Sequence, residues 1–216
     1  MSTFEFPHLL RLVSENQFDT IYHEHYSYLS LIAVKRIFEH NGLSVFDVEE
    51  LPTHGGSLRV YAQRTDSGIH EISANVANML QREVQAGMTT LTFYAGFQAK
   101  ADQVKNDLLA FLIEAKRAGK TVAGYGAAAK GNTLLNYAGV RPDLLPYVVD
   151  RNPAKQDKFL PGCRIPIVAE AHLIQAKPDY VVILPWNLRT EVIEQLAYIR
   201  EWGGQFVTAV PNIKIT

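Results

Sequence analysis

Residues 20–30, with the sequence TIYHEHYSYLS, place several side chains that can exchange protons in one short segment. Tyr22, His23, Glu24 and His25 follow one another directly. In an extended backbone the two histidines face one side and Glu24 faces the other, so the three side chains do not converge on one metal ion. The i, i+4 histidine spacing of a helical zinc site is also missing, and we therefore predict no metal site here. The structural alternative is a polar core in which these imidazoles and phenols are hydrogen-bonded.

The same side chains suit proton transfer next to a carbonyl group. A neutral imidazole, with a reference pKa of about 6.5, can accept a carbon-bound proton that a neighbouring carbonyl acidifies. Tyr22 is suited to donate a hydrogen bond to the resulting enolate oxygen. Glu24 is suited to orient an imidazole or to hold a charged group of the substrate. The segment therefore favours general acid/base chemistry.

A second candidate is the turn PTHGGS at residues 52–57. His54 stands beside Gly55 and Gly56, and glycines let the backbone come close to a ligand. The alternative is a hairpin turn that needs glycine only for its backbone conformation.

The third candidate is GYGAAAKGNT at residues 124–133, which follows an expected strand and opens an expected helix. Gly124 and Gly126 permit a tight turn, and the exposed N–H groups of the helix start attract phosphate. Lys130 and Asn132 are placed to add phosphate contacts. The spacing is looser than Gly-x-Gly-x-x-Gly, so two interpretations stay open: a nucleotide site, or close packing of the strand on the helix.

Asp150 ends the next expected strand, where dinucleotide-binding folds often carry an acid that binds ribose. This placement keeps an NAD site as an alternative. A carboxylate that only caps a turn or helix is the other interpretation of Asp150.

The composition is that of an ordinary globular protein, with 47% hydrophobic and 20% charged residues. Lys and Arg number 21 against 22 Asp and Glu, so no overall charge favours nucleic acid or an anionic membrane. The single Cys163 excludes an intrachain disulfide framework and suits a reducing compartment. We find neither an apolar run of about 18 residues nor a secretion signal. We therefore expect a cytoplasmic protein.

Hydrophobic periodicity divides the chain into three segments. Residues 1–68 predict a short helix, a second helix capped by Ser30, and a hairpin. Residues 69–118 are helical, and residues 119–216 alternate strand and helix. Because strands with short helical crossovers form parallel sheets, the sequence predicts an α/β fold whose last segment is a Rossmann-like parallel sheet with helices on both faces. The expected strands are 4–6, 43–51, 57–64, 121–125, 146–150, 179–185 and 205–211, and the expected helices are 8–16, 31–42, 75–86, 91–119, 130–137, 170–175 and 187–200.

Five stretches together resemble the S-adenosylmethionine-dependent sugar C-methyltransferase family. Members of this family transfer a methyl group from S-adenosylmethionine to a carbon of a deoxysugar carried on a nucleoside diphosphate. The stretches follow in the family's order over nearly the whole chain, and they are NQFDTIYHEHYSYLSL, LPTHGGSLRVYAQR, VAGYGAAAKGNTLLNY, VVDRNPAKQDKFLPG and ILPWNL.

The resemblance implies an organisation of the chain. Residues 1–68 would close a methyltransferase domain with a partial methyltransferase sheet, residues 69–118 would form a helical connector, and residues 119–216 would form a C-terminal Rossmann-like domain. This last domain would help to enclose the nucleotide sugar.

The resemblance also implies roles for single residues. It places the catalytic group on Tyr22, Glu24 and His25, with His25 as the base that takes a proton from the carbon beside a 4-keto group. The enolate would then attack the sulfonium methyl group. His23 stands where the family varies and is left out. The implied substrate-binding residues are His54, Gly55, Gly56, Gly124, Gly126, Lys130 and Gly131, the last four serving either the sugar nucleotide or the packing of the domain.

The sequence also departs from the family. Its zinc-binding cysteines are missing, and so is the glycine-rich loop that holds S-adenosylmethionine. Gly126 does not replace this loop, because it follows the catalytic segment instead of preceding it. We therefore expect a chain that does not methylate alone and that works with a separate N-terminal methyltransferase half. Apolar sheet edges favour self-association as a homo-oligomer.

Two further functions stay open from the sequence. One is a nonenzymatic nucleotide-binding module, in which the last segment binds and the first 65 residues dock to a partner. The other is an NAD-dependent oxidoreductase built on Gly124, Gly126 and Asp150.

Overall fold

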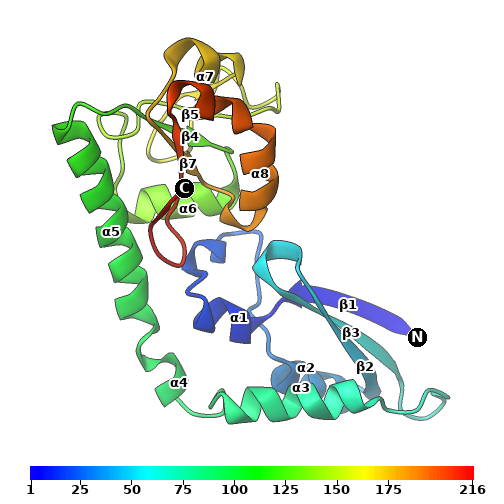
Figure 1. The fold of residues 1–216 in the computed structure, drawn as a ribbon. Helices are drawn as coiled ribbons and strands as arrows, with labels where there is room; N and C mark the ends of the chain where they lie inside the picture. The colour runs from blue at the N-terminus through cyan, green and yellow to red at the C-terminus, as the bar shows by residue number, and fades with distance from the viewer. The chain divides into compact units, whose positions relative to one another are not determined.

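The computed structural model describes all 216 residues. The chain forms two compact units: residues 1–18 and 24–98 make the first, and residues 19–23 and 99–216 make the second (Figure 1). The three-part division at residues 68 and 118 stays a prediction. No helix combines the length and the apolar character needed to cross a membrane.

The first unit contains a three-stranded antiparallel sheet in the order β1-β3-β2. Alternate residues of the central strand, Leu58, Val60 and Ala62, are completely buried, so one face of this strand rests on a core. The outer strand β1 pairs only with β3. The strands are β1 (Ser2–Pro7), β2 (Leu43–Leu51) and β3 (Ser57–Arg64), which confirms the predicted hairpin.

Helices α2 and α3 cover this sheet, and their apolar faces form one core cluster with it. Ser30 caps α2 as predicted, because its Oγ accepts a hydrogen bond from the Ala33 backbone N–H at 3.1 Å. The core consists of Leu31, Val34, Val45, Val48, Leu58, Val60, Val76 and Met79. The helical elements are α1 (Leu9–Ser14), η1 (Phe18–Thr20), α2 (Leu31–His40), η2 (Thr53–Gly55), α3 (Ala74–Gln85) and α4 (Thr92–Ala95).

The helix predicted for residues 91–119 is interrupted. Helix α4 ends before Gly96, and α5 (Phe97–Arg117) begins after it. Glycine has a low helix propensity, which fits a break at this residue. The buried stripe therefore lies on α5 alone, with Ala101, Val104, Leu108, Leu112 and Ala115.

The second unit has a six-stranded sheet in the order β6-β5-β4-β7-β8-β9. All neighbouring pairs are parallel except β8 with β9, which are antiparallel. This mainly parallel sheet with its helices confirms the predicted α/β, Rossmann-like fold. The strands are β4 (Val122–Tyr125), β5 (Val148–Val149), β6 (Ile167–Val168), β7 (Tyr180–Ile183), β8 (Gln205–Thr208) and β9 (Lys214–Ile215).

Two features of this unit differ from the prediction. The two-residue strands β6 and β9 are too short to show a hydrophobic period, so the sequence does not reveal them. The helix predicted for residues 187–200 forms three successive pieces. The helical elements are α6 (Ala129–Tyr137), α7 (Ala171–Ala176), η3 (Trp186–Leu188), α8 (Arg189–Gln195) and η4 (Ala197–Trp202).

The core of the second unit lies against the parallel strands. Phe206 of β8, Leu173 of α7 and Leu196 after α8 are almost completely buried in one cluster with residues of β4 and β7. Cys163 is also buried, in the turn between β5 and β6.

Candidate functional site

The predicted catalytic segment forms a loop between η1 and α2. Tyr22 and His25 are half-buried, and Glu24 is exposed. Tyr22 belongs to the second unit, whereas Glu24 and His25 belong to the first.

The turn at residues 52–57 has the backbone that its glycines permit. His54, Gly55 and Gly56 all have positive φ, at 58°, 92° and 123°. A Cβ on Gly56 would lie 2.9 Å from Cγ of Arg11, so this position also needs the space that glycine leaves. The Gln17 side chain donates a hydrogen bond to the Gly55 carbonyl at 2.8 Å, which fixes the turn.

The structure brings His25 and His54 together. Their ring centroids lie 6.3 Å apart, and the rings are nearly perpendicular, with an interplanar angle of 89°. One ring comes from the segment predicted to carry the base, and the other comes from the turn predicted to bind substrate. This pair joins the two candidates in the first unit.

A buried carboxylate fixes the far end of the catalytic segment. Glu83 of α3 is completely buried, and its Oε1 accepts hydrogen bonds from the Leu31 N–H at 2.6 Å and from Nε2 of His8 at 2.8 Å. Its Oε2 accepts the Ile32 N–H at 2.8 Å. The first N–H groups of a helix lack partners within it, and the helix dipole favours a negative charge there. Glu83 thus holds the start of α2, which directly follows the segment.

In the second unit, the glycines of residues 124–131 allow close packing. A Cβ on Gly124 would lie 2.8 Å from Cγ2 of Val148, and one on Gly131 would lie 2.5 Å from Cβ of Leu184. Gly126 has a φ of 88°, and a Cβ there would lie 2.6 Å from Cδ of Pro185. These contacts favour the packing interpretation of the glycines.

Asp150 accepts hydrogen bonds from two turns, the glycine-rich turn after β4 and its own turn after β5. Its Oδ2 accepts the Ala127 N–H at 2.7 Å, and its Oδ1 accepts the Asn152 N–H at 2.8 Å. The Lys155 ammonium lies 3.3 Å from Oδ2. These bonds favour the turn-capping interpretation of Asp150 over the ribose-binding one.

Lys130 lies in a cluster that the sequence does not reveal. It is buried, its Nζ lies 4.4 Å from the centroid of the Trp186 ring, and it donates a hydrogen bond to Oδ1 of Asn187 at 3.1 Å. The Trp186 indole N–H in turn donates to Oδ2 of Asp19 at 2.7 Å. Asp19 is completely buried, and its Oδ1 has no hydrogen-bond partner.

The cluster changes the acidity of its members. Burial raises the pKa of Asp19 from 3.8 to about 6, although the Trp186 hydrogen bond and the Lys130 charge act in the opposite direction. Burial likewise lowers the pKa of Lys130, and Asp19 partly offsets this effect. A buried carboxylate with one side-chain donor is costly to charge, so the charge state of Asp19 affects the stability of the second unit.

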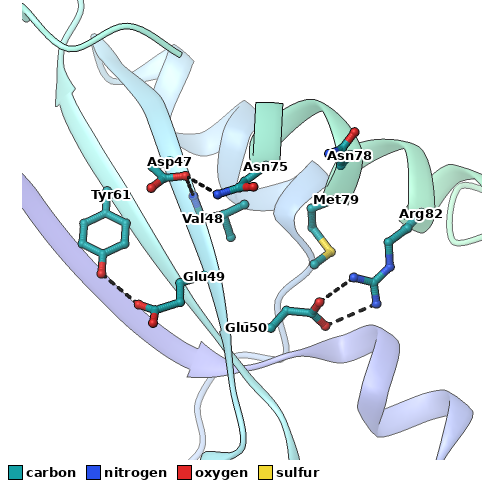
Figure 2. Close-up of a pocket in the computed structure, with 9 residues that line it drawn as sticks. All are labelled: Asp47, Val48, Glu49, Glu50, Tyr61, Asn75, Asn78, Met79 and Arg82. Carbon is teal, nitrogen blue, oxygen red and sulfur yellow. Dashed lines mark hydrogen bonds and ion pairs between the residues drawn. The ribbon is translucent and has the colours of Figure 1, made fainter. Parts of the chain in front are cut away.

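A groove of about 480 Å³ lies between β2, β3 and α3 (Figure 2). Its carboxylates are occupied: Arg82 pairs with Glu50, the Tyr61 hydroxyl donates to Glu49 at 3.0 Å, and Asn75 donates to Asp47 at 3.0 Å. The hydrogen bond from Arg82 is the main cause that lowers the pKa of Glu50.

None of the predicted site residues lines this groove. No group of three His, Cys, Asp or Glu side chains is placed to hold a metal ion.

Sequence reasoning missed Asp19, Glu83 and Trp186, which make the buried hydrogen bonds described above. Asp19 and Trp186 stand in two of the stretches that carry the family resemblance, NQFDTIYHEHYSYLSL and ILPWNL. Their occurrence in those stretches is the signal that could have singled them out. Glu83 lies outside all five stretches, and nothing in its surroundings in the sequence marks it.

Comparison with known proteins adds two findings. Residues 52–211 match the family model of the C-methyltransferase C-terminal domain. The chain is 37% identical over 211 residues to the C-methyltransferase NovU of Streptomyces niveus, a match that covers 98% of this chain and 50% of that protein. The chain thus spans about half the length of this curated relative.

Proposed function

Since the chain belongs to the C-methyltransferase C-terminal domain family, we propose that it is the C-terminal part of an S-adenosylmethionine-dependent sugar C-methyltransferase. Its substrate would be a keto-deoxysugar carried on a nucleoside diphosphate. The observation that carries this proposal is the pairing of His25 with His54, because it joins two of the stretches that resemble the family.

His25 is the base in this proposal. Its imidazole takes the proton from the carbon beside the 4-keto group, and the electrons of the broken C–H bond form the enolate. Tyr22 donates a hydrogen bond to the enolate oxygen, which stabilises the charge that develops there. Glu24 orients an imidazole or holds a charged group of the substrate. His54, Gly55 and Gly56 form the wall of the substrate site next to His25.

S-adenosylmethionine, when bound, supplies an electrophilic methyl group. In this proposal the residues of this chain do not hold the cofactor alone. The carboxylates of the groove between β2, β3 and α3 already bind Arg82, Tyr61 and Asn75, so the cofactor's ribose hydroxyls would compete with these partners. We therefore propose that the methyl donor binds to a separate N-terminal methyltransferase half, and that the present chain does not methylate alone.

The unpaired edge of β1 suits such a partner. This strand pairs on one side with β3, and the exposed Phe4 stands in it. An unpaired strand edge is a template for another strand. A partner half, or a second copy of this chain in a homo-oligomer, would cover it. The other candidate functions, a nonenzymatic nucleotide-binding module and an NAD-dependent oxidoreductase, receive no specific support from the site.

The test of this proposal follows proton removal directly. The chain is mixed with the first half of NovU and a thymidine-diphosphate 4-keto-sugar in D2O, and NMR records deuterium entering the carbon beside the ketone. We expect exchange in the mixture and a loss on the order of 10²- to 10⁴-fold with His25→Ala, the contribution of a positioned base. His40→Ala is the matched control, because His40 is an exposed histidine of α2 in the same unit.

Three outcomes would contradict the proposal. Exchange that survives His25→Ala would remove His25 as the base. Methyl transfer by the purified chain alone would refute the need for a partner half. Calorimetric binding of NAD, without binding of the sugar nucleotide, would support the oxidoreductase instead.

A further inference from the structure

Residues 19–23 belong to a different unit from the residues directly before and after them. The residues on both sides, up to Phe18 and from Glu24, belong to the first unit, whereas residues 19–23 belong to the second. Tyr22 lies in this piece, three residues after Asp19. A residue that holds Asp19 therefore restricts the backbone close to Tyr22.

A hydrogen bond from Trp186 links this piece to the rest of the second unit. The indole N–H donates to the Asp19 carboxylate at 2.7 Å, and the carboxylate is completely buried. Hydrogen bonds to charged groups contribute more than neutral ones, and a buried carboxylate that loses its donor is strongly destabilised.

Lys130 contacts the face of the Trp186 indole. Its ammonium group lies 4.4 Å from the centroid of the Trp186 ring and bonds Asn187, the residue that follows Trp186. Its positive charge also favours the charged form of Asp19. An ammonium over an aromatic face is attracted by the ring, and it fixes the ring in place.

The glycines explain how Trp186 reaches this position. Strands β4 and β7 are parallel neighbours, so their carboxyl ends lie at the same edge of the sheet. The Leu184 N–H donates to the Tyr125 carbonyl at 3.0 Å, which keeps the two strand ends together. Gly126 and Gly131 leave the space that Pro185 and Leu184 fill. The glycine turn thereby lets residues 184 and 185 pack closely against it, and this packing places Trp186.

We propose that Trp186 and Lys130 are positioning residues, which hold Asp19 and through it the backbone of Tyr22 at the carboxyl ends of β4 and β7. This inference rests on the proposed function for the role of Tyr22, but the link itself does not depend on methyl transfer. The stretches GYGAAAKGNT and ILPWNL thus serve to place residues 19–23.

The test compares Trp186→Phe with Trp202→Phe in the full 216-residue chain. Trp202 is a matched control, because its indole N–H also donates one hydrogen bond in the second unit, to the Pro178 carbonyl at 3.1 Å. The readouts are amide hydrogen exchange of residues 19–23 and the NMR signals of the Tyr22 ring, assigned with Tyr22→Phe. We expect Trp186→Phe to speed this exchange on the order of 10- to 100-fold and to shift the Tyr22 signals. Trp202→Phe leaves both unchanged.

Unchanged exchange and unchanged Tyr22 signals in Trp186→Phe would overturn the proposal, and so would equal changes in the two variants. If Trp186→Phe unfolds the second unit, Asp19→Ala and Asp19→Asn replace it. The asparagine keeps an oxygen that accepts the indole N–H and retains the wild-type signals, whereas alanine releases the piece. Wild-type exchange in Asp19→Ala would overturn the proposal.

None of these readouts needs a substrate, so they separate this inference from the proposed function. In the deuterium-exchange assay with the NovU half, Trp186→Phe is expected to lower kcat with little change in KM, because the variant displaces Tyr22 and leaves the substrate-binding turn of the first unit intact. A wild-type kcat would show that the link does not position Tyr22 for the reaction.

Discussion

Glu83 and Asp19 are both completely buried, but their carboxylates are satisfied to different degrees. Glu83 accepts hydrogen bonds from two backbone N–H groups at the start of α2 and from His8. Asp19 accepts one hydrogen bond from Trp186, and its other oxygen has no partner. One carboxylate fixes the residues after the catalytic segment, and the other fixes the residues at its beginning.

The difference shows how a buried carboxylate can serve two purposes. Backbone donors at a helix start are numerous, rigid and aligned with the helix dipole, so the charge on Glu83 is well compensated. A single side-chain donor compensates a buried charge only in part. Glu83 therefore stabilises the first unit, whereas the contribution of Asp19 to the second unit depends on its protonation.

The largest effect is expected from Glu83→Ala. This change leaves the two N–H groups of α2 and the His8 ring buried without their partner, so the free energy of unfolding of the first unit should fall by about 3–5 kcal/mol. The most slowly exchanging amides of β3 report this loss by hydrogen exchange. Glu49→Ala is the control, because the Glu49 side chain is about half exposed and bonds a surface tyrosine. Equal effects of both changes would show that burial does not distinguish Glu83.

The next largest effect is expected when the pH changes the stability of the second unit. The pKa of Asp19 is about 6 in the folded chain and near 3.8 when exposed, so the native unit binds more protons between these two values. The contribution of Asp19 to the stability of the second unit is therefore full below about pH 4. It is lost as the pH rises through about 6. The shift corresponds to about 3 kcal/mol.

Carbon-13 NMR of the carboxyl groups measures this pKa directly. Asp179 is an internal comparison, because hydrogen bonds from Lys120 and Thr121 lower its pKa to about 2. Trp186→Phe removes a donor that favours the charged form, so it should raise the pKa of Asp19 further. An Asp19 that titrates near 4 in the wild type would contradict the idea that its charge is poorly compensated.

The smallest effect is expected from Ser30→Ala. Ser30 accepts only the Ala33 N–H, while Glu83 accepts the two N–H groups before it. Loss of a serine cap typically costs about 1 kcal/mol, and the two bonds of Glu83 would remain. Thermal unfolding followed by circular dichroism would show a small shift. A loss as large as that of Glu83→Ala would mean that the serine, and not the buried carboxylate, holds the helix start.

The sequence predicts the parts of the fold whose signals are local. The hairpin of β2 and β3 follows from alternating residues around a glycine turn, and the cap of α2 follows from a serine before an apolar helix. The sequence did not predict the helix break at Gly96, because the apolar stripe continues across this residue. A single glycine is a weak signal within a helical pattern.

The candidate site is harder to predict, because its contacts are distant along the chain. Asp19 and Trp186 are 167 residues apart, and His8 and Glu83 are 75 residues apart. No hydrophobic period marks a buried carboxylate. The groups that donate hydrogen bonds to it come close only when the chain folds. The glycine-rich surroundings of Lys130 make it a candidate in the sequence, but they do not reveal its contact with an indole.

The buried Cys163 has a practical consequence for studying these differences. It is the only cysteine in the sequence, its side chain is 1% exposed, and it belongs to the second unit. A thiol reagent must therefore wait for that unit to open before it can react. The kinetics of labelling then follow openings of the second unit alone, in a chain whose first unit is invisible to the reagent.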